Sequence, residues 1–346
     1  MEGYDLLQRN LPKDVRRSLN LSVGHMLTSL RSESKIQKSE NIRAGLSIRA
    51  DLDDTKEDET LILGNKLGQG GFSTVHSLRN DPNVACKFLS NSSLHAEEGD
   101  SLDKKLRNLK IASEDIVREH HFLSSLDHPH IISVKGVGSL DDMGSYYILL
   151  DKVSTPLSDK MESWELARVD NGLLQERMEY ALQIASAFTY LHSLNIIYRD
   201  LKIDNLGLNE KDKILVYDFG LAKELKGTPC ENGKYKLSGG TGSYAYMAPE
   251  VAKNYRYNLS VDVYSYGIVL WEMFSGKYAY ANLRPEAVSG TNERPPLVQN
   301  WPLDLEKLLG ECWHWNQNKR PSFPEIESRL QEIMEKEFPK KKGFFW

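Results

Sequence analysis

The stretch Tyr198-Arg-Asp-Leu-Lys-Ile-Asp-Asn-Leu206 is the most informative part of this 346-residue chain. It places Asp200, Lys202 and Asn205 at fixed offsets, and a second acidic motif, Asp218-Phe219-Gly220, begins 13 residues after Asn205. Moving a phosphoryl group needs such a set: a carboxylate that orients the attacking hydroxyl and accepts its proton, a cation on the transferring phosphate, and oxygen ligands for Mg²⁺. One motif alone is weak, but the two in this order indicate phosphoryl-transfer chemistry.

These two motifs resemble the catalytic loop and the magnesium-binding triplet of eukaryotic protein kinases. The resemblance covers about residues 58–334 and implies an α+β, bilobal protein-kinase fold. The expected N-lobe, residues 58–153, is a small antiparallel β-sheet with one long helix, and the expected C-lobe, residues 154–334, is mostly helical. ATP is expected in the cleft between the lobes.

Hydrophobic periodicity and turn residues predict the elements independently of this resemblance. Strands are predicted at residues 60–63, 73–78, 84–89, 131–137 and 146–150, and helices at about 104–126, 173–194, 261–274, 303–312 and 323–336. Strands therefore precede helices along the chain, as the two expected lobes require.

Two flanking segments differ in composition from this central part. Residues 1–57 are polar and mixed in charge, which predicts a largely disordered extension. Apolar residues at helical spacing between Val15 and Leu30 leave open a helix that docks on the catalytic domain or on a partner. Residues 335–346 form a basic and aromatic C-terminal tail, interpreted as a solvated or packed terminus, with a lipid or peptide anchor as the alternative.

The overall composition excludes several other classes of protein. A net charge of −5 argues against a nucleic-acid-binding module. No apolar run reaches the ~18 residues of a membrane span, and no signal peptide is recognisable. Three dispersed cysteines suggest neither a disulfide framework nor a zinc site, and the four histidines between His120 and His130 lack the pattern of a metal site. The expected location is intracellular, in the cytoplasm; the oligomeric state is left open.

A glycine-rich turn lies between the first two predicted strands. Glycines allow backbone amides to approach phosphate oxygens, and the strand–turn–strand context excludes a dinucleotide-binding loop, which a helix must follow. Serine replaces the third glycine of the usual kinase pattern. The resemblance implies that the nucleotide contacts Leu67, Gly68, Gly70, Gly71, Ser73, Val75 and Ala85, with Leu150, Asp151 and Val153 at the gatekeeper and hinge.

Lys87 ends the strand Val84-Ala-Cys-Lys87, 14 residues after Ser73. By resemblance it anchors the phosphates and pairs with a glutamate of the following helix, a pair that forms in the active state. Counting back from Leu126-Asp-His-Pro-His-Ile131 selects Glu119, with Glu114 as the competitor.

Further roles follow from the resemblance. Asp200 is the expected general base or hydroxyl-orienting group, and Lys202 neutralises the γ-phosphate. Asn205 and Asp218 hold Mg²⁺. Arg199 is of the kind that holds a phosphorylated activation loop, in which Ser238 and Thr241 are the leading phospho-acceptor candidates, ahead of Thr228 and Tyr235.

Three residues are expected to support the C-lobe: Asp262 anchors the catalytic-loop backbone, and Glu250 and Arg320 form a buried ion pair. Ser243 stands where serine/threonine kinases usually have a threonine that bridges the catalytic Asp and Lys, and together with Lys202 it implies, by this resemblance, serine/threonine specificity. Cys312-Trp313 and Glu293-Arg-Pro-Pro-Leu297 resemble the tyrosine-kinase-like group. Only 13 residues separate Tyr280 from Arg294, several fewer than that group uses to build its substrate-docking helix, so a docking helix in this segment is left open.

The expected function is therefore Mg²⁺- and ATP-dependent phosphorylation of protein serine and threonine hydroxyls. A pseudokinase scaffold, a tyrosine or dual-specificity kinase and a small-molecule kinase are the alternatives. Competent residues at Lys87, Glu119, Asp200, Asn205 and Asp218 argue against the pseudokinase. The Ala248-Pro-Glu250 segment argues against the small-molecule kinase.

Overall fold

The computed structural model describes residues 43–44, 47–49, 60–70, 73–89, 102–138, 146–166, 170–230, 233–297 and 301–339. The chain divides into two compact units, residues 1–127 with 132–153, and residues 128–131 with 154–346. Across the described ranges, no helix combines the length and apolar character needed to cross a bilayer.

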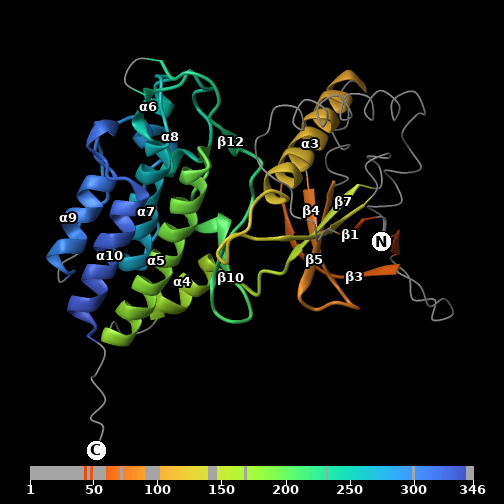
Figure 1. Ribbon diagram of the computed structural model, residues 1–346, viewed down its shortest axis with the longest axis horizontal. Coiled ribbons are helices and arrows are strands. Elements are labelled where there is room, and N and C mark those ends of the chain that lie inside the picture. Colours follow the sequence, from red (N-terminus) through yellow and green to blue (C-terminus); the bar gives the residue numbers. More distant parts are fainter. Residues whose placement is uncertain are drawn as a thin grey trace, which may run out of the picture. The chain divides into compact units, whose positions relative to one another are not determined.

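A seven-stranded sheet forms the first unit, with strand order β1-β6-β7-β5-β4-β3-β2 (Figure 1). Its strands are β1 (Arg43–Ala44), β2 (Ser47–Arg49), β3 (Thr60–Gln69), β4 (Ser73–Leu78), β5 (Val84–Leu89), β6 (Val134–Val137) and β7 (Tyr147–Asp151). The pairs from β3 to β6 are antiparallel, as predicted, whereas the edge strands β1 and β2 pair in parallel.

Helix α3 (Leu102–Leu123) packs on this sheet and is the one long helix that the sequence predicts. Cys86, Phe88, Tyr147 and Leu149 form the core beneath the central strands. Strands β1 and β2 were not predicted, because each is shorter than the four to eight residues that a hydrophobic pattern needs. The predicted helical pattern at 15–30 and the tail after residue 339 lie outside the described residues.

The second unit is mainly helical. Its helices are α4 (Leu157–Leu166), α5 (Asn171–Ser193), α6 (Pro249–Ala252), α7 (Ser260–Ser275), α8 (Pro285–Val288), α9 (Leu303–Cys312) and α10 (Phe323–Glu337). Its short strands form two small sheets: β8 (Thr155–Pro156) with β10 (Leu206–Leu208) and β11 (Ile214–Val216), and β9 (Ile196–Ile197) with β12 (Lys223–Glu224).

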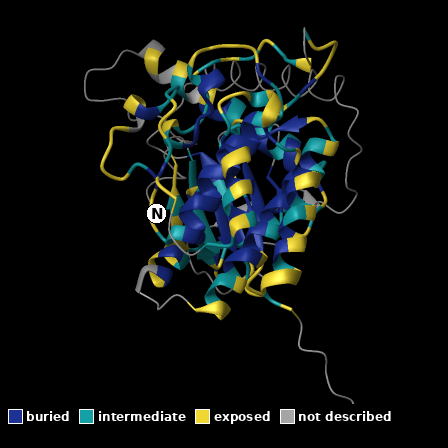
Figure 2. Ribbon diagram, turned by 90° about the vertical axis from the view of Figure 1, so that its left-hand side faces the viewer, coloured by how far each residue is buried: buried dark blue, intermediate teal, exposed yellow. Residues whose placement is uncertain are grey.

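Local sequence explains where the main helices begin and end. Asp170 caps α5 by accepting a hydrogen bond from Leu173 N, and Ser322 and Glu325 form a capping box on α10. Gly276 ends α7 with φ of 66°, a left-handed conformation that favours glycine. Figure 2 shows exposed residues on the outer faces of the helices and buried residues behind them.

Helix α7 is the centre of this core. Every residue from Val261 to Phe274 is buried, including Asp262 and Glu272. A helix that is buried all round can carry charged groups only where these have hydrogen-bond partners, so both carboxylates indicate specific contacts.

Candidate functional site

Asp262 of α7 holds the backbone of the loop that carries Asp200. Its Oδ2 accepts a hydrogen bond from Tyr198 N at 2.9 Å, and its Oδ1 accepts one from Arg199 N at 2.8 Å. Arg199 has φ of 70°, a conformation that is costly for a residue with a side chain. The two hydrogen bonds from a fully buried carboxylate therefore stabilise a backbone shape that the loop would not favour alone.

Asp200, Lys202, Asn205 and Ser243 form one hydrogen-bonded group. Asp200 Oδ1 accepts from both N and Oγ of Ser243, each at 2.9 Å. Asp200 Oδ2 lies 3.1 Å from Lys202 Nζ and 3.0 Å from Asn205 Nδ2. Lys202 Nζ also donates to Ser243 Oγ at 3.0 Å. The serine hydroxyl thus connects the carboxylate and the ammonium group and fixes their relative positions.

Asn205 and Asp218 are suited to bind a hard cation. Asn205 Nδ2 is committed to the backbone and side chain of Asp200, whereas Asn205 Oδ1 accepts no hydrogen bond from the described residues. Among the residues that the structure describes, the Asp218 carboxylate accepts one hydrogen bond, from Gly220 N at 3.4 Å. Since Tyr217 N donates to Asn205 O at 3.1 Å, the backbone brings the two positions together. Oxygen ligands left free in this way fit Mg²⁺, which takes few protein ligands and completes its shell with phosphate and water.

Tyr198 and Phe219 connect the two motifs through the core. Their rings meet edge to face at 5.1 Å, and the Tyr198 hydroxyl donates to Tyr217 O, the carbonyl that precedes Asp218. Both side chains are fully buried. The aromatic residue in place of histidine therefore still supports the Asp-Phe-Gly segment.

Residues 61–338 match the family profile described as protein kinase domain. The chain belongs to the protein kinase family. The expected bilobal kinase fold and the likeness to serine/threonine kinases near the tyrosine-kinase-like group are thereby confirmed. Members of this family use ATP and Mg²⁺.

Curated proteins similar to this kinase include kinases of Arabidopsis thaliana and Dictyostelium discoideum. The serine/threonine/tyrosine-protein kinase HT1 of Arabidopsis thaliana is 30% identical over 317 residues, covering 89% of this chain and 75% of that protein. The dual specificity protein kinase shkE of Dictyostelium discoideum is 32% identical over 223 residues, 62% of this chain and 30% of that protein. The serine/threonine-protein kinase VIK of Arabidopsis thaliana is 42% identical over 166 residues, which cover 46% of this chain and 38% of that protein.

In the first unit of the kinase, Lys87 of β5 forms an ion pair with Glu119 of α3. The competitor, Glu114, instead lies 3.9 Å from Lys110. The neighbouring His120 contacts the buried Tyr146 hydroxyl through Nδ1 at 2.6 Å, which connects α3 to the start of β7. The unit therefore contains the ion pair expected of an active kinase.

The residues expected around the nucleotide lie on neighbouring strands of the same unit. Gly68 is opposite Val75, Val75 opposite Lys87, and Ala85 opposite Leu150. Ala85 and Leu150 are buried, whereas Leu67 is exposed. Gly70 N donates to Ser73 O at 2.8 Å and so closes the turn; Gly71 lies outside the described residues.

Asp151 was expected to meet adenine through its backbone, and its side chain is occupied elsewhere. Its Oδ2 accepts from Ser133 N at 3.0 Å and from Ser133 Oγ at 2.6 Å, and its Oδ1 lies 2.8 Å from Lys135 Nζ. Val153 ends the same segment and the unit. The carboxylate thus fastens the end of β7 to the β6 side of the sheet.

Arg199 contacts the segment that carries the predicted phospho-acceptors. Its Nη1 donates to Ser238 Oγ at 3.3 Å, and Ser238 Oγ lies 3.0 Å from Thr241 Oγ1. The Tyr257 hydroxyl also contacts this segment, donating a hydrogen bond to Ser238 O at 2.7 Å. The Ser238 hydroxyl therefore lies beside a guanidinium group, and the Thr241 hydroxyl is hydrogen-bonded to Ser238.

Glu250 and Arg320 form a bidentate ion pair, with N–O distances of 2.6 and 2.9 Å. Both residues are buried. Arg320 also donates to Ser260 O and His314 O, at 3.1 and 2.9 Å, and therefore connects the Ala-Pro-Glu segment to the start of α7 and to the residues after α9.

The predictions above did not include the second buried carboxylate of α7, Glu272. Its Oε2 accepts from the Tyr246 hydroxyl and its Oε1 from Ala279 N, both at 2.8 Å. Burial raises the pKa of Glu272 to about 8, against the lowering effect of these two hydrogen bonds. The signal in the sequence was a lone glutamate inside the apolar run 266–274.

The segment between Tyr280 and Arg294 forms only the single turn α8.

Proposed function

We propose that this kinase transfers the γ-phosphoryl group of ATP to serine and threonine hydroxyls of protein substrates, using residues 58–334 as its catalytic domain. The observation that carries the proposal is the group formed by Asp200, Lys202 and Ser243, in which one hydroxyl connects the carboxylate and the ammonium group. A phosphoryl-transfer site works mainly by positioning and electrostatics, and this group supplies both.

Asp200 orients the substrate hydroxyl and accepts its proton, while Lys202 neutralises charge on the transferring phosphate. Asn205 Oδ1 and the Asp218 carboxylate hold Mg²⁺, which neutralises the polyphosphate when bound. The free oxygens of both residues support this assignment.

In the first unit, Lys87 holds the phosphates and Glu119 keeps its side chain in place, a role that their ion pair supports. Gly68, Gly70, Gly71 and Ser73 present backbone amides to the phosphates. Leu67, Val75, Ala85 and Leu150 surround adenine, and the backbone of Asp151 and Val153 hydrogen-bonds to it. The engagement of the Asp151 carboxylate with Ser133 and Lys135 supports the backbone role.

Phosphoryl transfer from ATP to a generic protein substrate tests the proposal. Asp218→Asn and Lys87→Met should each lower the rate by about 10² or more, since each removes a group that stabilises the transferring phosphate. Equal signals from the wild type and both variants would show that a contaminating kinase is responsible, and would leave the protein as a scaffold.

Dual specificity is the second candidate, favoured by the names of HT1 and shkE. Phospho-amino-acid analysis of the autophosphorylated wild type separates the two. Phosphoserine and phosphothreonine alone support the first proposal. Phosphotyrosine that disappears in Asp218→Asn supports the second.

A further inference from the structure

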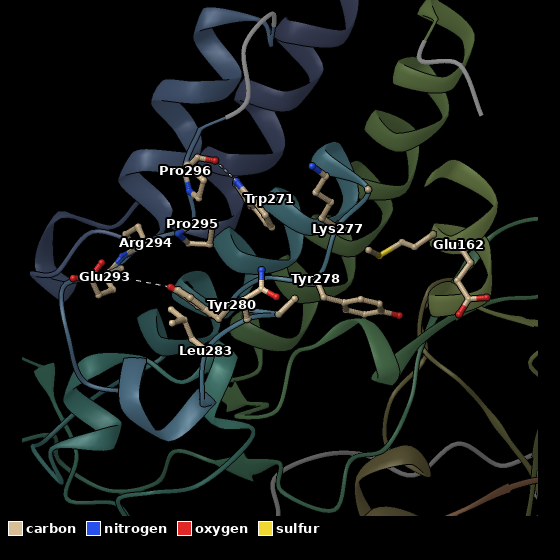
Figure 3. Close-up of a pocket in the computed structure, with 14 residues that line it drawn as sticks. Glu162, Trp271, Lys277, Tyr278, Tyr280, Leu283, Glu293, Arg294, Pro295 and Pro296 are labelled. Atoms are coloured by element: carbon tan, nitrogen blue, oxygen red, sulfur yellow. Dashed lines mark hydrogen bonds between the residues drawn. The ribbon is translucent and has the colours of Figure 1, made fainter. Parts of the chain in front are cut away.

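A pocket of about 480 Å³ opens in the second unit where α4, the end of α7 and the chain between residues 280 and 296 meet (Figure 3). Its apolar lining comes from Trp271, Tyr278, Tyr280, Leu283, Pro295 and Pro296. Leu283 and Tyr278 are 55% and 43% exposed. The volume is in the range of about 300–1,000 Å³ that suits a bound side chain or small ligand. None of the proposed catalytic residues lines this pocket.

The floor of the pocket is rigid. Trp271 Nε1 donates to Pro296 O at 2.8 Å, which fixes the proline segment against α7. Arg294 donates to the carbonyls of Trp313, Thr291 and Glu293, at 3.0, 3.3 and 2.6 Å. The pocket is therefore preformed, which lowers the cost of binding.

The rim carries carboxylates that have no cationic partner. Glu162 and Glu293 line the pocket, and neither forms an ion pair with a residue that the structure describes. The lining cations are Lys277 and Arg294, and Arg294 is bound to carbonyls. On the α4 side, Tyr278 has a raised pKa, first through burial and then through the carboxylates of Asp204, Glu162, Glu272 and Asp159. An aromatic occupant suits the apolar lining, and the carboxylates around Tyr278 on the α4 side suit a basic one.

The chain itself contains a segment of this chemistry. Residues 340–346, Lys-Lys-Lys-Gly-Phe-Phe-Trp, combine three cations with three aromatic rings directly after α10 and outside the described residues. Aromatic rings bury large apolar areas and stack on tyrosine and proline, while lysines suit the unpaired carboxylates.

Two contacts connect the end of α10 with the part of α7 next to the pocket. In its last turn, Lys336 Nζ lies 2.7 Å from Asp304 Oδ2 at the start of α9. Trp301 precedes Asp304 by three residues, and its ring centroid lies 6.0 Å from that of Phe274. Phe274 is in turn two residues before Gly276, which lines the pocket. Seven extended residues span up to about 23–25 Å, so a segment that follows α10 can extend along these contacts toward the pocket.

We propose that residues 340–346 dock in this pocket, with Phe344, Phe345 and Trp346 against Tyr278, Leu283 and the two prolines. The lysines then lie toward Glu162 and the acidic side of α4. The docked segment covers an apolar surface that would otherwise face water, at a place separate from the proposed phosphoryl-transfer site.

Limited trypsin digestion of the full chain, followed by intact mass, tests the docking because trypsin cleaves after Lys340, Lys341 and Lys342. Cleavage in this segment should be slow in the wild type. Leu283→Asp, which places a charge on the apolar wall, should accelerate it by about tenfold, equivalent to about 1.4 kcal/mol. Glu162→Lys should accelerate it through charge alone.

Tyr255→Asp is the matched control, since Tyr255 is 60% exposed but does not line the pocket. Its cleavage rate should equal that of the wild type. These outcomes require no kinase activity and are thus independent of the proposed function.

Rapid cleavage of the wild type, at the rate of Leu283→Asp, would overturn the proposal and leave the pocket to a separate partner protein. Protection that grows with protein concentration would also overturn it, because the occupant would then belong to a second copy of the chain.

Discussion

Ser243 donates two hydrogen bonds to a single oxygen of Asp200, one from its backbone N and one from its hydroxyl, both of 2.9 Å. The hydroxyl also accepts from Lys202. Ser243→Ala keeps the backbone bond and the direct contact of 3.1 Å between Lys202 Nζ and Asp200 Oδ2, but it removes the hydroxyl that hydrogen-bonds to both groups. We expect kcat to fall roughly 10- to 100-fold, the equivalent of one hydrogen bond to a charged group.

Ser243→Thr is the matched control, because threonine keeps the hydroxyl. Steady-state rates with a protein substrate should stay within a few fold of the wild type for Thr. If Ala and Thr variants had the same kcat as the wild type, the bridging hydroxyl would have no role in catalysis.

Replacing Ser238 and Thr241 together by Ala should lower activity. A phosphate on either residue would lie beside Arg199 and gain charge-assisted hydrogen bonds. We expect a loss of about tenfold, corresponding to one such bond. Initial rates after preincubation with ATP measure the effect, and phosphatase treatment should bring the wild type down to the variant's rate. The exposed Thr228→Ala should retain full activity; undiminished turnover in the double variant would exclude regulation by these two residues.

Removing one partner of the buried Glu250–Arg320 pair should destabilise the kinase. Glu250→Ala leaves a buried guanidinium group without its carboxylate, and such a change typically costs about 3–5 kcal/mol. Chemical denaturation followed by tryptophan fluorescence gives the free energy of unfolding. The matched control is Glu311→Ala, which breaks a partly exposed pair with Arg329 and should cost about 0–1 kcal/mol. Similar losses in both variants would contradict the special role of the buried pair.

Glu272 should make stability depend on pH. Its pKa is about 8 in the folded kinase against 4.5 in the unfolded chain, so between these values the folded state holds a proton that the unfolded state releases. The free energy of unfolding therefore falls as the pH rises through this window and levels off above it. Glu272→Gln should remove on the order of 2–3 kcal/mol of the decrease between pH 6 and 8.5.

The comparison needs denaturation curves at both pH values, with the exposed Glu332→Gln as the control that keeps the wild-type dependence. An unchanged pH profile in Glu272→Gln would mean that this carboxyl titrates at an ordinary pKa.

Local patterns in the sequence predicted the elements that place the site. The strands of residues 73–78 and 84–89 and the helix of residues 303–312 have the predicted bounds, because apolar periodicity and turn residues mark both ends. Counting from the segment 126–131 selected Glu119, and the structure pairs it with Lys87. The resemblance to serine/threonine kinases likewise implied the contact between Ser243 and Lys202, which the structure contains.

Features that depend on long-range contacts were missed. Helix α4 begins directly after a two-residue strand among polar residues, although its buried Leu157, Met161 and Trp164 do follow helical spacing. Glu272 was visible as a charge in an apolar run, but its partners Tyr246 and Ala279 become neighbours only when the chain folds. Local sequence cannot supply such partners, because they come from separate elements.

The attachment of the catalytic loop to Asp262 has a consequence for how the enzyme unfolds. The amides of Tyr198 and Arg199 donate to the buried carboxylate of Asp262 in the first turn of α7, so we expect them to open to solvent only when that helix separates from its neighbours. Their hydrogen–deuterium exchange should therefore require global unfolding, unlike that of most surface loops. The arrangement of the catalytic residues would then be lost together with the native core, in one cooperative unfolding step.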